Sequence, residues 1–339
     1  MNNTSSALRI AATLFTIIAL FVYGIYSFFI KSQTTQPGIE YENVFLTGFA
    51  EKDSTTPQSL PVLTESEQSK DVISVSGAEA LGKVVNRTIS NSSSNLSAGG
   101  VHIRNSTDLD VSISELLSSK LGFTVKKDQN PQVLILHTHA TECFLSEDRD
   151  YYTAADKTRT TDNAFNVTKL GEIVADKLNS AGITTLHDKT QHDYPSYNES
   201  YSRAAKTINA YIKKYPSIKV VIDIHRDSVQ TDTTKTKLTA KIDGKKAAQV
   251  MLVMGSQSGN VKNFPNWKEN LKLAVRLQKN IESMYPNLAR PLSLMSRSYN
   301  EPLTTGSMLI EIGTEANAFD EAKYSAELLA NSLIKTLSS

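Results

Sequence analysis

Three short apolar runs in this chain each lead into residues that bind metals or transfer protons. They are VLILHTHATE (133–142), VVIDIH (220–225) and MLIEIG (308–313). Such aliphatic, largely β-branched runs are typical of strands buried on both faces of a parallel sheet. The residues directly after such strands lie at the carboxyl edge of the sheet, where ligands bind in open α/β folds. Because ionisable groups cost free energy to desolvate, their repeated placement there predicts a bound cation.

The chain beyond Pro131 alternates candidate strands with candidate helices. Strands are expected over 133–136, 183–186, 220–224, 250–254 and 308–312. Helices with apolar residues at i, i+3 and i+4 are expected over 166–179, 200–215, 267–284 and 320–337. This order predicts a three-layer α/β domain with a mostly parallel central sheet, occupying residues 101–339. A stretch rich in Thr and Lys, 231–248, is expected to be an exposed hairpin or loop beside the site.

The amino-terminal region carries an uncharged apolar stretch over residues 10–30. At about 1.5 Å per residue its length matches a hydrocarbon core of about 30 Å, which predicts a transmembrane helix. No A-x-A-like cleavage site comes after it, so a retained anchor is favoured over a signal peptide. The flanking Arg9 and Lys31 barely bias the orientation. The short tail, 1–9, is expected in the cytoplasm, which makes the chain a single-pass protein of the cell membrane with its main domain outside the cytoplasm.

Residues 31–100 are rich in Ser, Thr, Gln and Asn, which predicts a largely disordered stalk. A local helix is expected over 71–85 within it. The net charge is +1, from 36 basic and 35 acidic residues, which removes any case for attraction to nucleic acid. The chain has a single cysteine, so it has no disulfide framework of its own.

The first metal-binding candidates come after the first apolar run. His139 and Glu142 stand three positions apart, and an imidazole nitrogen and a carboxylate oxygen both bind zinc at about 2.0–2.2 Å. This spacing alone is weak, because most such pairs lie in solvated turns. His225 adds a third candidate from a second strand end, and three protein ligands with an open position for water is the arrangement of catalytic zinc.

Alternatives to this ligand set are also present. On an extended strand His137 would point to the same face as His139, so either could be the first ligand. Asp162 is a rival carboxylate, and Cys143 is a rival ligand, although a solitary cysteine is more often a small buried apolar residue. Three further histidines have no comparable context and are expected to be bystanders: His102, His187 and His192.

Glu311 interrupts an apolar strand, where a carboxylate is costly without a partner. Beside a metal-bound water it would act as general base, taking a proton as the water attacks a carbonyl and passing it to the leaving amine. The competing explanation is burial against a basic residue, with Arg226, Arg297 and Lys323 as candidates. Arg226 and Asp227 fit a supporting or substrate-binding role or an ordinary surface ion pair. Neither a G-x-S-x-G elbow nor a Gly-rich phosphate loop is present.

At these residues the chain resembles the stage II sporulation protein P family of endospore-forming bacteria. The resemblance covers residues from about 99 onward and rests on these segments: PQVLILHTHATE, DNAFNVTKLGEIVADKLNSAGI, YNESYSRAAKTI, VVIDIHRDS and MLIEIGTEANAFDEA. Through VVIDIH and LIEIG the chain is also distantly similar to the zinc N-acetylmuramoyl-L-alanine amidases. Those enzymes carry a Gly-His-Gly loop after the first strand and a Glu ligand at the start of the next helix. Here the loop reads HTHATE.

The resemblance implies a membrane-anchored, zinc-dependent peptidoglycan hydrolase. Its reaction would be cleavage of the amide between the lactyl group of N-acetylmuramic acid and the first L-alanine, with cross-link endopeptidase activity also attributed to the family. It further implies a place at the sporulation septum and engulfing membrane, with stage II sporulation proteins D and M as partners. The roles of His225 as ligand and Glu311 as base carry over directly. A non-catalytic peptidoglycan-binding scaffold at the septal membrane is the alternative.

Overall fold

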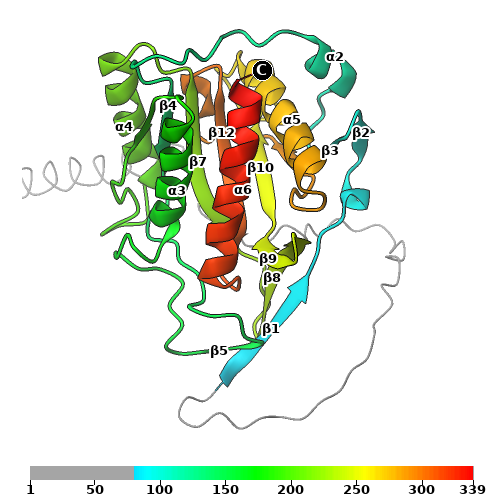
Figure 1. Ribbon diagram of the computed structural model, residues 1–339, viewed down its shortest axis with the longest axis vertical. Helices are drawn as coiled ribbons and strands as arrows, with labels where there is room; N and C mark the ends of the chain where they lie inside the picture. The colour runs from blue at the N-terminus through cyan, green and yellow to red at the C-terminus, as the bar shows by residue number, and fades with distance from the viewer. Residues whose placement is uncertain (1–79, 339) are drawn as a thin grey trace, which may run out of the picture. The chain divides into compact units, whose positions relative to one another are not determined.

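The computed structural model describes residues 80–338, all of which belong to one compact unit. Its centre is an eight-stranded sheet (Figure 1). The strand order is β2 (Leu96–Ala98), β3 (Val101–Asn105), β11 (Leu292–Met295), β10 (Val250–Gly255), β12 (Ser307–Thr314), β7 (Val220–Asp227), β4 (Val133–Leu136) and β6 (Thr185–His187). Neighbours are parallel except for the β2–β3 and β10–β12 pairs. The predicted mostly parallel sheet is therefore confirmed, with a change of direction at β10.

Helices cover the sheet on both faces. One face carries α2 (Ile113–Ser118), α3 (Val167–Ser180), α5 (Trp267–Met284) and α6 (Phe319–Leu337), the last three side by side in Figure 1. The other face carries α4 (Ser200–Lys214). These layers confirm the predicted three-layer α/β architecture, and the four long helices begin and end within a residue or so of their predicted bounds.

The central strands are apolar along their whole length because both of their faces are buried. Along β4, Leu134 and Leu136 pack with α4, whereas Val133 and Ile135 pack in the larger cluster beneath α3, α5 and α6. All four side chains are fully buried. An uninterrupted aliphatic run is what a parallel strand between two helical layers requires.

A second, four-stranded sheet adjoins the carboxyl-terminal edge of the first, in the order β5 (Tyr151–Thr153), β1 (Ala80–Arg87), β8 (Thr234–Ile242), β9 (Lys245–Ala248). The prediction of a helix over 71–85 was wrong for residues 80–85, which form a strand. β1 pairs with β8 in parallel and with β5 in antiparallel orientation, and Val84 packs with Leu145, Tyr152 and Ala316. Such pairing with distant strands overrides local preference.

The stalk therefore ends earlier than residue 100. β1, the short 3-10 helix η1 (Asn91–Ser93) and β2 all precede Val101 and belong to the folded unit. The stretch 231–248 forms the predicted hairpin, β8–β9, but it is only partly exposed: its turn at 243–246 is exposed, whereas Lys235, Lys237 and Leu238 are buried. The Lys235 ammonium lies over the Tyr152 ring, 4.4 Å from its centroid, which is a cation–π contact that favours its burial.

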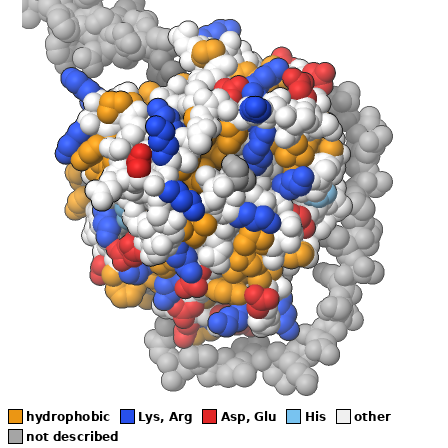
Figure 2. All heavy atoms as spheres, turned by 45° about the horizontal axis from the view of Figure 1, so that its top comes forward, with side chains coloured by type: hydrophobic (Ala, Val, Ile, Leu, Met, Phe, Trp, Pro, Cys, Tyr) orange, Lys and Arg blue, Asp and Glu red, His pale blue; other side chains and the backbone are white. Residues whose placement is uncertain are grey.

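Within residues 80–338, no helix is both long and apolar enough to cross a membrane. The predicted tail (1–9), membrane helix (10–30) and most of the stalk (31–79) lie outside the described residues. On the face shown in Figure 2, acidic and basic side chains are interspersed with apolar ones, in keeping with the net charge of +1.

Candidate functional site

The site lies at the carboxyl edge of the central strands. The parallel register of β7 and β12 places His225 directly opposite Glu311, and β4, on the other side of β7, leads into the loop that carries His139 and Glu142. All four side chains are buried. Residues far apart in sequence therefore meet here because three parallel strands end side by side.

His225 is held between two carboxylates. Its Nδ1 lies 3.5 Å from Glu142 Oε2, and its Nε2 lies 2.8 Å from Asp223 Oδ1. Asp223 in turn accepts hydrogen bonds from Thr138 N (2.8 Å) and Thr138 Oγ1 (2.6 Å). Burial opposes protonation, but Asp223 and Glu142 outweigh it and raise the pKa of His225 well above its ordinary value.

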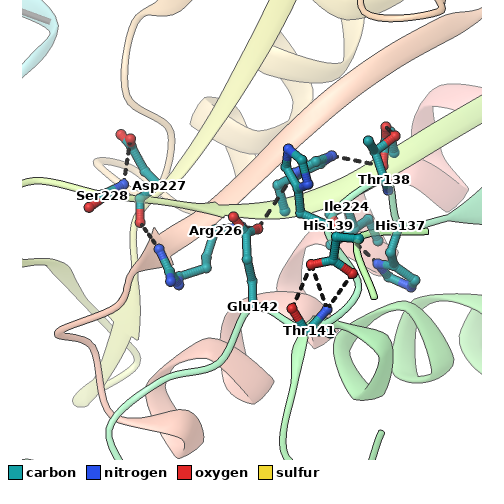
Figure 3. A network of polar contacts seen from close by, with 12 residues as sticks. His137, Thr138, His139, Thr141, Glu142, Ile224, Arg226, Asp227 and Ser228 are labelled. Atoms are coloured by element: carbon teal, nitrogen blue, oxygen red, sulfur yellow. Dashed lines mark hydrogen bonds and ion pairs between the residues drawn. The ribbon is translucent and has the colours of Figure 1, made fainter. Parts of the chain in front are cut away.

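Glu142 is a buried, ionised carboxylate. It accepts a hydrogen bond from Arg226 N at 3.2 Å (Figure 3), and Arg159 Nη2 lies 3.7 Å from its Oε1. Burial acts to raise its pKa, but His225 and Arg226 together lower it below the ordinary range. The side chain thus presents negative charge to His225 from the loop after β4.

His139 is enclosed by aromatic rings. It stacks on Tyr197 with centroids 4.5 Å apart and meets Tyr201 and His225 edge-on at 5.5 and 5.2 Å. Its Nε2 lies 3.1 Å from the Tyr197 hydroxyl and its Nδ1 3.4 Å from Ser200 Oγ. Burial lowers the pKa of His139 to about 3, so the ring is neutral, which is the form that binds metals.

His137 points away from this group, so its candidacy as first ligand is not supported. The chain turns at Thr138, and consequently the two histidines do not share a face. His137 Nδ1 donates to Ile224 O at 2.8 Å (Figure 3), and its Nε2 lies 2.9 Å from His187 Nε2 beneath α3. His187 is therefore a packing partner rather than a bystander. Burial, followed by the neighbouring His187, lowers the pKa of His137 to about 3.

The other rivals lie outside the site. Asp162 is exposed and accepts a hydrogen bond from Ala164 N at 3.0 Å, without reaching the histidines. Cys143 donates its thiol to Lys157 O at 3.1 Å, and burial raises its pKa. His192 bridges His137 O and Thr207 Oγ1, each at 2.9 Å. His102, in β3, contacts Ser97 Oγ at 2.8 Å.

Glu311 is the buried acid of the site, and its Oε2 makes no hydrogen bond to any described residue. Burial is the main cause that raises its pKa to about 8, with Asp227 adding to the shift. The three basic residues considered as its partners contact other groups: Arg226 donates to Cys143 O and Thr158 O, Arg297 to Ser296 O, and Lys323 pairs with Asp320. Among the described residues, no buried ion pair accounts for Glu311.

Arg226 and Asp227 do not form a surface pair with each other. Arg226 is buried and ties the strand to the loop after β4 through the carbonyl groups it binds. Asp227 Oδ2 accepts hydrogen bonds from both terminal nitrogens of Arg290 at 2.8 Å. Both residues therefore support the walls of the site.

Several residues of the site were not anticipated. Asp193 accepts hydrogen bonds from Thr141 Oγ1 (2.5 Å) and Arg159 Nη1 (2.6 Å), which fixes the loop carrying His139. Tyr197 and Tyr201 surround His139. The i, i+4 spacing in YNESY was the one visible signal for this pair, but nothing in the sequence connected it with the HTHATE loop.

Two of the three expected ligands have the spacing that zinc requires. With Zn–N and Zn–O distances of about 2.0–2.2 Å, ligand atoms of a tetrahedral site lie about 3.4 Å apart. The 3.5 Å between His225 Nδ1 and Glu142 Oε2 agrees, and the carboxylate of Asp223 at the other ring nitrogen is the usual support of a metal-binding histidine. The nitrogens of His139 instead contact hydroxyl groups. Across residues 80–338 no three His, Cys, Asp or Glu side chains are grouped so as to hold an ion.

The solved structures that resemble this chain include three amidases with low sequence identity. The N-acetylmuramoyl-L-alanine amidase from Clostridium difficile 630 is 14% identical, covers 62% of this chain and 96% of its own, and has a TM-score of 0.37. The amidase Ami1 from Mycobacterium abscessus is 13% identical, with coverages of 62% and 98% and a TM-score of 0.36. The CwlD amidase from Clostridioides difficile, solved in complex with the GerS lipoprotein, is 10% identical, with coverages of 61% and 98% and a TM-score of 0.37.

Sequence comparison gives a closer result. Stage II sporulation protein P from Bacillus subtilis (strain 168) is 30% identical over 210 residues, or 59% of this chain. The match spans 49% of that protein, so it covers about half the length of the relative. The model of the family described as stage II sporulation protein P (SpoIIP) matches residues 45–334, most of the chain. This chain therefore belongs to the stage II sporulation protein P family.

Proposed function

We propose that this protein is a zinc-dependent peptidoglycan hydrolase that cleaves the amide between N-acetylmuramic acid and L-alanine. The observation that carries the proposal is the placement of Glu311, a buried carboxyl with an unpaired oxygen, directly opposite His225 on the neighbouring strand. A buried acid whose pKa is raised to about 8 suits proton transfer near neutral pH. A scaffold that only binds cell wall has no use for such a group.

The roles of the chain's own residues follow from their contacts. His139, Glu142 and His225 would hold the zinc, with one nitrogen of His139 exchanging its hydroxyl contact for the ion. Bound zinc polarises a carbonyl oxygen and lowers the pKa of water at the site. Asp223 fixes the ring of His225 through the 2.8 Å contact at Nε2. Glu311 accepts a proton from the attacking water and later delivers it to the leaving nitrogen.

Family membership supports the biological setting of this proposal. We place the activity in remodelling of the septal wall during sporulation and engulfment, with peptide cross-links as a second candidate bond. In this setting the chain is anchored in the cell membrane through residues 10–30, its hydrolase domain lies outside the cytoplasm, and stage II sporulation proteins D and M are its candidate partners.

The experiment is digestion of purified peptidoglycan by the full-length protein, with the released groups identified by mass spectrometry. New L-alanine amino termini are the expected product. Glu311→Gln should lower the rate by about 10²–10⁴-fold, the usual contribution of a general base. Glu315→Gln is the matched control, since Glu315 is also a buried acid just beyond β12 but lies beside Arg226.

Two other outcomes would redirect the proposal. Saturable binding to the wall without release of new amino groups would favour the scaffold. Full activity of the Glu311→Gln protein would contradict the role of this residue. Removing metal with a chelator should abolish hydrolysis, and added zinc should restore it.

A further inference from the structure

We propose that the hydroxyl group of Tyr201 donates a hydrogen bond to the carbonyl oxygen of the scissile amide as that oxygen becomes negative. This inference rests on the proposed function and assigns a further catalytic residue to it. Tyr201 lies in the first turn of α4, with its ring edge-on to His139 at 5.5 Å. Its hydroxyl oxygen is buried and makes no hydrogen bond to any described residue.

Two unpaired polar atoms lie in the same part of the site. They are Tyr201 Oη and Glu311 Oε2. The rings of Tyr201 and His225 both contact His139, and Glu311 lies opposite His225 in the strand register. Buried polar atoms are almost always hydrogen-bonded, so unpaired atoms gathered around a candidate general base indicate a polar ligand.

The polar groups nearest to Tyr201 bind other partners, so its hydroxyl is available to a substrate. Asp223 accepts two hydrogen bonds from Thr138. The Tyr197 hydroxyl lies 3.1 Å from His139 Nε2. The ordinary pKa of a tyrosine hydroxyl is about 10, so the phenol is protonated at neutral pH and available as a donor.

The position of Tyr201 is fixed by its backbone. Asn300 Nδ2 donates to Tyr201 O at 2.9 Å, and Arg203 Nε, in the same turn, donates to His192 O at 2.6 Å. These bonds tie the start of α4 to two loops at the edge of the sheet. A donor held in place before reaction is the arrangement that stabilises a developing oxyanion most effectively.

The chemical step is balanced without any additional reagent. The water oxygen bonds to the amide carbon while its proton passes to Glu311, and the electron pair of the C=O double bond moves onto the carbonyl oxygen. Tyr201 stabilises that charge through its O–H. When the double bond re-forms, the C–N bond breaks and Glu311 returns the proton to the leaving nitrogen.

The test compares Tyr201→Phe with the parent protein, both full length and zinc-loaded, on a soluble N-acetylmuramoyl peptide. The substitution keeps the ring against His139 and removes only the hydroxyl. Removal of one oxyanion donor typically lowers kcat by about 100- to 1,000-fold, and we expect that loss with KM and the melting temperature unchanged. Tyr211→Phe is the matched control, because it removes a hydroxyl from the same helix that instead contacts Asp188 Oδ2 at 3.1 Å.

The outcomes separate this inference from the proposed function. If the parent hydrolyses the peptide, Glu311→Gln does not, and Tyr201→Phe retains kcat within about twofold, the inference alone is wrong. A raised KM with unchanged kcat would also overturn it, since the hydroxyl would then bind the ground state equally. If the parent releases no product, the proposed function fails and the inference fails with it.

Discussion

At the scale of single residues, the molecule keeps several carboxyl groups under its surface, and their surroundings decide their charge. Asp223 and Glu142 are ionised because donors surround them: burial opposes ionisation, but His225 and other donors lower the pKa of each. Glu311 has few donors, and burial raises its pKa to about 8. Groups whose environments push their pKa values apart are the usual basis for assigning acid and base roles.

Glu301 is a buried carboxyl group outside the expected zinc ligands, and it tests whether burial sets the charge of such groups. It is fully buried, its Oε2 accepts from Gly255 N at 2.9 Å, its Oε1 makes no hydrogen bond to any described residue, and burial raises its pKa well above 4.5. The folded state therefore holds this proton more tightly than the unfolded chain does. Its contribution to stability is full below pH 4.5 and is lost as the pH rises toward the folded-state pKa.

Glu301→Gln mimics the protonated acid at every pH. Relative to the parent it should have a similar free energy of unfolding at pH 4 and a higher one at pH 8, where the parent has lost the contribution of the bound proton. Urea unfolding at the two pH values measures this difference. A difference that does not change with pH would show that the carboxyl group is not the cause.

At the scale of elements, the site depends on how α3 approaches the end of β4. Gly171 lets the helix come close: a Cβ atom there would lie 2.5 Å from His137 Nε2 and 2.7 Å from His187 Nε2. The histidine pair thus occupies the space that a side chain on α3 would need. His137, through its carbonyl oxygen, also positions His192. Helix packing and the geometry of the loop after β4 are consequently linked.

Gly171→Ala should destabilise the protein by about 1–3 kcal/mol through overpacking, although alanine is the better helix former. Thermal unfolding of the single variant gives the net effect. In a His187→Ala background, where one of the two rings is absent, the penalty should be smaller. Equal stability of Gly171→Ala and the parent would mean that the contact is not tight.

The elements that can be predicted from sequence are those whose signal lies within one short stretch of the chain. The bounds of β4 and α5 depend on an aliphatic run and an amphipathic stripe that need no distant partner. β1 was missed because Lys83 pairs with Thr234, far away in the sequence. The sequence alone does not choose between His137 and His139, because the choice depends on a turn at Thr138 that periodicity cannot reveal. The reversed direction of β10 relative to β12 likewise depends on tertiary packing.

At the scale of the whole folded unit, the second sheet packs against the segment that comes after the site loop. β1 pairs with β8 on one side and β5 on the other, and its Val84 packs against Leu145, which comes after the HTHATE loop. The amino-terminal strand therefore supports the wall of the site although it precedes the segment that carries the ligands. A domain cut at residue 101 lacks this support.

Removing residues 1–88 should cost more stability than removing residues 1–79. The difference is the loss of β1, and burial of Val84 alone accounts for about 1.5–3 kcal/mol. Urea midpoints of the two truncated proteins measure it. Identical midpoints would show that β1 contributes nothing to the folded unit.

The most direct test of the account is the zinc content of the purified full-length protein, determined by elemental analysis on the parent and its variants. We predict about one zinc per chain in the parent, as in a catalytic site with three protein ligands. His225→Ala, Glu142→Gln and His139→Ala should lose the metal, whereas His137→Ala and Cys143→Ser should retain it. Absence of zinc from the parent after incubation with the metal, or its retention in His225→Ala, would contradict the assignment of this sheet edge as a metal-dependent hydrolase site.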